Sequence, residues 1–133
     1  VQVYKTEAAA MGVVDGDAAP FIAHKFTQFA RLLYSQGVPG GAPISAEVRV
    51  WQMPDAATCL ALYTDLATDS LYKPFTWEDA TVGEAGKIAN ASGKYWVYAH
   101  KGVYEFEVKI QSADASARTA ALAFANAIAA KIK

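Results

Sequence analysis

The sequence predicts one α+β domain over residues 1–133: an antiparallel sheet of five to six strands with helices packed on it, an α/β/α-like sandwich. Three observations support this fold class. Several segments alternate apolar and polar side chains, as half-buried strands do. Two other segments repeat apolar residues at helical spacing. Turns rich in Gly, Pro and Asp separate them, and antiparallel meanders with helices on a face form α+β folds.

The first third of the chain predicts an edge strand, a short helix and a longer strand. Residues Val1–Tyr4 suit an edge strand or an ordered arm. Asp17 is expected to cap a short helix that ends near Lys25. We interpret Phe26–Ser35 as a strand, although it could also extend this helix, because the Gly- and Pro-rich loop at 37–43 suits a hairpin.

The middle of the chain predicts a return strand, a helix and a long connection. From Ile44 to Gln52 the side chains alternate, which places Arg49 and Trp51 on the polar face. The next helix spans about Asp55–Thr68, with its acidic residue in the first turn as the helix dipole prefers. The connection Leu71–Gly86 is long, and such loops in compact domains are often functional.

The clearest element is a hairpin between Tyr95 and Ile110. Lys101 and Gly102 suit a two-residue turn, because Gly tolerates the positive φ that hairpin turns need. In that register Tyr98 pairs with Glu105. One face is then apolar, and we expect the other to be an open face that is part aromatic and part acidic. That second face carries Trp96, Tyr98, His100, Glu105 and Glu107.

Two further elements complete the predicted fold. A strand is expected at about Lys87–Ala91, just before the hairpin. Asp114 is expected to cap a final helix that runs to about Ile132. The buried stripe of that helix is predicted to comprise Ala121, Phe124, Ala125, Ile128 and Ile132.

Composition excludes several classes of function. The net charge is −1 and no block of like charges exists, so we expect no nucleic-acid binding. No apolar run approaches the ~20 residues of a transmembrane helix. The first residue is Val rather than Met, which fits removal of a signal peptide or a shortened chain. We interpret the protein as exported, either periplasmic or extracellular.

No residue pattern is typical of a catalytic, metal or cofactor site. Cys59 falls on the apolar stripe of its helix, which favours a buried structural thiol over a nucleophile. His24 and His100 are the only histidines and show no metal-binding spacing. Glu105 and Glu107 would lie about 7 Å apart on one strand face, a spacing that any Glu-x-Glu strand produces.

Two segments also carry a motif pattern. Val14–Phe26 (VDGDAAPFIAHKF) and Lys101–Val108 (KGVYEFEV) resemble the IDGxA opening and the kGxYxvxv hairpin of a bacterial family of exported proteins of unknown function. Ala46–Ala56 and Val82–Gly86 match other family segments loosely and in the same order. The chain departs from the pattern at His24, where the family has Tyr-Gly-Phe. The resemblance implies export and an α+β fold like that of the extrinsic photosystem PsbP proteins. It implies no reaction.

These observations favour a non-enzymatic exported module that binds a protein partner or forms a homo-oligomer, as an accessory subunit of a larger assembly. Interfaces favour Trp, Tyr and Arg, which the polar sheet face contains. The alternative is a small-ligand binder with a pocket at the Leu71–Gly86 loop around Trp77, and the third is a small hydrolase. The candidate binding residues are Trp51, Arg49, Trp96, Tyr98, His100, Glu105 and Trp77.

Overall fold

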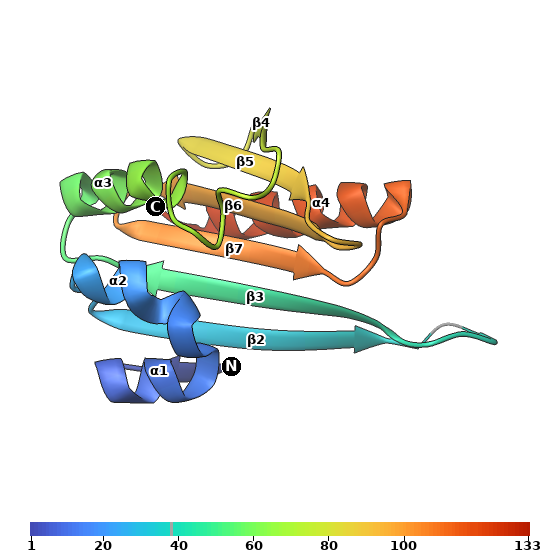
Figure 1. Ribbon diagram of the computed structural model, residues 1–133, viewed down its shortest axis with the longest axis horizontal. Coiled ribbons are helices and arrows are strands. Elements are labelled where there is room, and N and C mark those ends of the chain that lie inside the picture. Colours follow the sequence, from blue (N-terminus) through green and yellow to red (C-terminus); the bar gives the residue numbers. More distant parts are fainter. Residues whose placement is uncertain (38) are drawn as a thin grey trace.

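A computed structural model describes residues 1–37 and 39–133 and shows one antiparallel sheet with helices on both of its faces (Figure 1). The strand order is β1-β2-β3-β7-β6-β5-β4. The predicted α+β class is confirmed, but the predicted five to six strands are in fact seven, because two three-residue strands form the edges. The strands are β1 (Gln2–Tyr4), β2 (Gln28–Gln36), β3 (Ile44–Gln52), β4 (Glu78–Ala80), β5 (Ala85–Asn90), β6 (Tyr95–Lys101) and β7 (Tyr104–Ile110).

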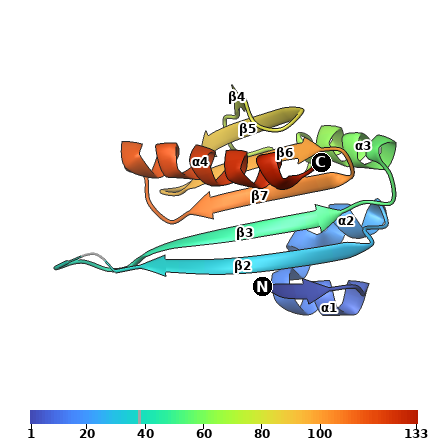
Figure 2. The ribbon, with the colours of Figure 1, turned by 180° about the vertical axis from the view of Figure 1, so that it is seen from behind.

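The helices divide between the two faces of the sheet (Figures 1 and 2). One face is covered by α1 (Glu7–Val14), α2 (Ala19–Ala23) and α3 (Ala56–Leu66). The other is covered by α4 (Ala115–Lys131) alone, which packs on β6 and β7. Within the described residues, none of these helices combines the length and apolar character that crossing a bilayer requires.

Local side-chain bonds explain where the helices begin. Asp55, expected in the first turn of this helix, is instead the N-cap of α3, since its Oδ1 accepts a hydrogen bond from the Thr58 N–H at 2.7 Å. Thr6 caps α1, a helix that the sequence analysis did not predict. The prediction for Asp17 is wrong: it lies inside a 3-10 turn, η1 (Asp15–Ala18), and its carboxylate bonds to Arg49 instead of capping α2.

The central hairpin is shifted by two residues from the predicted register. Tyr98 pairs with Glu107 rather than Glu105, and the turn residues are Gly102 and Val103. Gly102 adopts a φ of +57°, so it still supplies the positive φ that the turn needs. A shift of two preserves strand parity, and every side chain therefore stays on its predicted face. The predicted loop at 37–43 includes position 38 and so falls partly outside the described residues.

The α4 stripe is only partly buried as predicted. Ala121 and Ala125 are fully buried between the helix and the sheet, whereas Phe124, Ile128 and Ile132 are only partly buried. The reason is that α4 lies over β6 and β7 and leaves the neighbouring strands β2 and β3 open on this face. Apolar side chains of α4 therefore border an open groove.

A substitution at Gly83, in the bend between β4 and β5, tests how closely this bend packs against the backbone of His100 in β6. Its φ is +61°, and a Cβ at this position would lie 2.5 Å from the backbone oxygen of His100. We expect Gly83→Ala to lower the free energy of unfolding by at least about 3 kcal/mol, because steric overlap with a rigid carbonyl adds to left-handed strain. Gly102 has a similar φ but open space around it. Gly102→Ala should therefore cost only about 1 kcal/mol. If urea unfolding showed equal losses of stability for Gly83→Ala and Gly102→Ala, the predicted steric overlap at Gly83 would be refuted.

Candidate functional site

The predicted binding residues share one sheet face, but that face is closed. Trp51 and Tyr98 are 0% exposed and Trp96 is 2% exposed, so the expectation of an open aromatic face is wrong. Trp51 is stacked between Phe21 of α2 and Phe29 of β2, with ring centroids 4.0 and 3.9 Å away. The helices α1–α3 and the segment that follows α3 complete the cover.

Trp77 fills the region where the sequence suggested a ligand pocket. Its ring packs edge-on against Trp96 and Tyr98, with centroids 5.2 and 4.7 Å away. Its Nε1–H donates to the backbone oxygen of Tyr72 at 2.8 Å, and Tyr72 is itself buried. This part of the Leu71–Gly86 connection is therefore a packed lid on the aromatic core.

Charged residues are buried beneath the same cover, around Arg49. The Arg49 Nε–H donates to Glu47 at 2.6 Å and its Nη1–H donates to Asp17 at 2.9 Å. Burial lowers the pKa of Arg49, but the nearby Glu107, Glu47 and Asp17 carboxylates outweigh that effect and raise it overall. Arg49 is thus permanently charged, and it ties η1 to the sheet.

The register brings Glu107 beside Arg49 on β3 and Tyr98 on β6. Glu107 also accepts a hydrogen bond from the hydroxyl of Tyr72, which lies in the segment after α3. In the next row, Lys109 extends its ammonium over the Trp96 ring, 4.2 Å from the centroid. The buried charges therefore connect the sheet to two parts of its cover. The Arg49–Asp17 pair reaches η1, and the Tyr72–Glu107 hydrogen bond reaches the segment after α3.

Glu105 is the exception in this network. It is fully buried, and both of its carboxyl oxygens lack a partner in the described part of the chain. Burial raises the pKa of the Glu105 carboxyl well above its ordinary value of 4.5; the Glu107 carboxylate raises it further, and Lys109 and Arg49 offset part of the rise. Burial therefore favours the neutral form of this carboxyl group.

The remaining candidates for chemistry, Cys59 and His100, are buried. Burial raises the pKa of the Cys59 thiol to about 12, with Glu105 and Glu84 adding to the rise, so the thiolate nucleophile is scarce. Burial lowers the pKa of His100, and Glu84 offsets only part of that. Among residues 1–37 and 39–133, no group of three His, Cys, Asp or Glu side chains could hold a metal ion. The buried network serves packing, and ligand access must be sought elsewhere.

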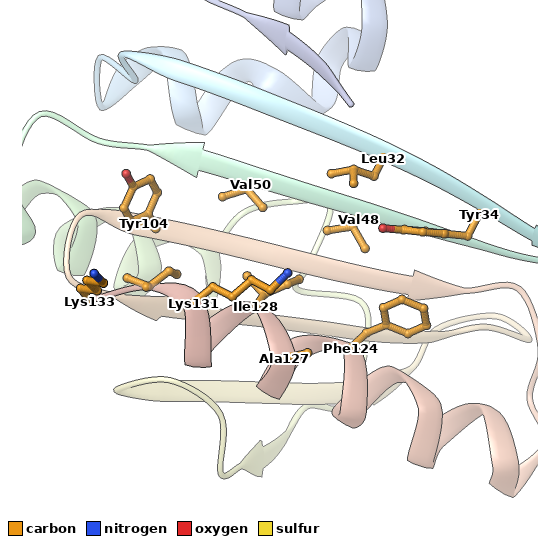
Figure 3. Close-up of a pocket in the computed structure, with 11 residues that line it drawn as sticks. Leu32, Tyr34, Val48, Val50, Tyr104, Phe124, Ala127, Ile128, Lys131 and Lys133 are labelled. Atoms are coloured by element: carbon orange, nitrogen blue, oxygen red, sulfur yellow. The ribbon is translucent and has the colours of Figure 1, made fainter.

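The open surface is concentrated around the outer half of β2. Figure 3 shows a groove of about 710 Å³ between α4 and the β2–β3 strands. Leu32, Val48 and Val50 form its sheet side, and Phe124 and Ile128 come from α4. The sequence analysis assigned both α4 residues to the core. The sequence did contain a signal for their exposure: the apolar side of α4 is too wide to be buried by β6 and β7 alone.

The second open surface is the outer edge of β2. β1 pairs only with Phe29–Arg31, and the rest of β2 has no strand neighbour on that side within the described residues. Leu33 is 66% exposed and Tyr34 is 45% exposed. The loop after Phe26–Ser35 predicted a strand here but could not show which of its edges would stay free.

No family model, curated protein or solved structure matches this chain. Export, the resemblance to an exported bacterial family and the predicted binding role therefore remain predictions.

Replacing Glu105 with Gln should change the pH dependence of stability. In the unfolded chain Glu105 ionises above about pH 4.5, whereas in the folded protein its pKa is raised, so wild-type stability is lost as pH rises between the two pKa values. The loss is about 1.4 kcal/mol per pH unit in that window. Glu105→Gln does not titrate, so its stability relative to the wild type should increase as pH rises above about 4.5, up to the folded-state pKa of Glu105.

The measurement is urea unfolding of both proteins at a series of pH values. His100, whose lowered pKa gives an opposite slope, is present in both proteins and largely cancels in the difference. A difference that stays flat above pH 4.5 would show that Glu105 ionises normally in the folded state.

Trp51→Ala tests whether the aromatic face is core. Because Trp51 is fully buried between two rings, we expect a loss of about 3–5 kcal/mol in the free energy of unfolding. Leu33→Ala, at an exposed position, should change it by less than about 0.5 kcal/mol. A folded Trp51→Ala protein of unchanged stability would reopen the interface interpretation.

Proposed function

We propose that this protein is a non-enzymatic binding module that adds an extended segment of a partner protein to the free edge of β2. The observation that carries the proposal is the unpaired stretch Leu32–Gln36, next to the three residues that β1 already covers. Strand addition satisfies such an edge through main-chain hydrogen bonds, and the alternate side chains add specificity. Export and a place in a larger assembly remain predictions from the sequence.

Hydrogen bonds elsewhere in the sheet indicate which groups of β2 point outward. Met53 donates its N–H to Val103 and Gln111 donates to Ser45, so the odd-numbered residues of β3 face β7. The even-numbered residues of β3 then face the even-numbered residues of β2, with which they are paired. It follows that Leu33 and Ser35 direct their N–H and C=O groups to the outer edge.

The side chains at this edge suit an uncharged, partly apolar strand. The sequence LLYSQ from Leu32 to Gln36 contains no charge and no proline, the devices that normally protect an edge. A recess of about 490 Å³, lined in part by Val1 and Leu33, lies beside it. The opposite edge is different, because β4 is three residues long and carries Glu78 and Asp79.

A proline at position 35 tests the proposal. Ser35→Pro removes the outward N–H without touching a β2–β3 hydrogen bond, so the fold should survive. Ser35→Ala keeps the N–H and is the matched control. The probes are peptides selected on the wild-type protein from a displayed random 12-residue library and then synthesised. We expect them to bind the wild type and Ser35→Ala equally and Ser35→Pro at least about tenfold more weakly.

Isothermal titration measures the affinities, and circular dichroism checks that each variant is folded. Peptides that bind Ser35→Pro as tightly as the wild type would refute strand addition at this edge. Peptides that instead lose binding when Ala127, in the groove beside α4, is changed to Trp would place the protein-binding surface there.

A further inference from the structure

The groove beside α4 has the form of a site for an elongated apolar molecule. Its volume of about 710 Å³ falls in the range of small-molecule sites. Leu32, Val48 and Val50 line it from the sheet, and Phe124 and Ile128 from the helix (Figure 3). Beyond Tyr34 and Phe124, whose ring centroids are 5.4 Å apart, a second apolar recess of about 470 Å³ continues along α4. The two recesses together follow the length of the helix.

The charge of the groove is one-sided. Among the lining residues in the described part of the chain, Lys131 and Lys133 are the only ones with charged side chains, and both side chains are cationic. Figure 3 shows Lys133 near Tyr104 at the end away from Tyr34 and Phe124. None of the ion pairs within residues 1–37 and 39–133 involves either lysine. The α4 dipole accounts for a cation at Lys131, in the last turn, but not for Lys133, which lies beyond the helix.

We infer that this groove binds a single-chain amphiphile with an anionic headgroup, such as a long-chain carboxylate. The hydrocarbon chain lies along the apolar walls, where it removes their surface from water together with its own. The headgroup lies in the half of the groove that carries Lys131 and Lys133, whose ammonium groups can provide charge-assisted hydrogen bonds. This groove adjoins the strand edge of the proposed function at Leu32 and Tyr34, but it uses side chains rather than backbone groups, and either site can fail without the other.

The same features select against three other occupants. A neutral apolar ligand leaves the lysine pair without a partner, and a cationic amphiphile is repelled by it. A membrane surface meets the molecule along a broad plane, whereas these apolar residues are recessed between α4 and the β2–β3 strands. A free amphiphile is therefore the occupant that matches both the shape and the charge.

The test compares three probes of equal chain length: dodecanoate, dodecanol and dodecylammonium, each as a monomer in solution. Isothermal titration should rank the affinities of the wild type in that order. For the double variant Lys131→Glu/Lys133→Glu, dodecanoate should bind at least about tenfold more weakly, and dodecylammonium should become the preferred probe. Rising salt should weaken dodecanoate binding to the wild type more than dodecanol binding.

A second pair of variants locates the chain. Ala127 is exposed on α4 and lines the groove, so Ala127→Trp should fill the site and abolish dodecanoate binding. Ala123 is equally exposed on the same helix but is not among the lining residues, and Ala123→Trp should bind as the wild type does. Circular dichroism confirms folding of both variants.

Three outcomes would overturn the inference. They are equal affinity for dodecanoate and dodecylammonium, undiminished binding to Ala127→Trp, and absence of dodecanoate binding to the wild type. A sedimentation experiment with vesicles distinguishes binding of a free amphiphile from binding to a membrane surface. The protein should not sediment together with vesicles of anionic phospholipid. Sedimentation with such vesicles, lost in the Lys131→Glu/Lys133→Glu variant, would replace the proposed site with a membrane-binding surface.

Discussion

The closed face of the sheet depends on the buried guanidinium of Arg49. Its permanent charge must be matched inside the protein, and the matching groups come from different parts of the chain. Glu47 lies on its own strand, Asp17 lies in η1, and Glu107 lies across the sheet on β7. Because Glu107 in turn accepts from Tyr72, the lid that follows α3 is joined to the same charge. Loss of one partner would leave a buried charge uncompensated, which is the costly state for such a network.

The two faces of the sheet are closed by different means. On the Arg49 side, stacked aromatic rings and ion pairs complete the cover from α1–α3 and the segment after α3. On the other side a single helix packs through Ala117, Ala121, Ala125 and Ala129, whose small side chains allow close approach to β6 and β7. One helix is narrower than seven strands, so β2 and β3 keep an uncovered apolar surface. The groove follows from that difference in width.

Much of the fold was predictable from local pattern, and the cover of the sheet was not. Alternation fixed the parity of β3, β6 and β7, and parity survived an error of two residues in the hairpin register. The carboxylates Glu105 and Glu107 made one face look wet, because acidic residues are rarely buried without partners. The partners of Glu107, Arg49 and Tyr72, are distant in sequence and carry no local signal. The eight-residue helix α1 was equally hard to find, since its sequence EAAAMGVV shows little separation of apolar and polar sides.

The same reasoning explains why the candidate site moved from the aromatic face to β2. A residue type that suits an interface also suits a core, so Trp51, Trp96 and Tyr98 could not distinguish the two from sequence alone. What distinguishes an accessible surface is an unmet physical requirement. Within residues 1–37 and 39–133, the outer edge of Leu32–Gln36 has no strand partner, and the groove combines open apolar walls with two lysines that form no ion pair. Tyr34 borders both surfaces, so the outer half of β2 is where the fold leaves most of its bonding capacity unused.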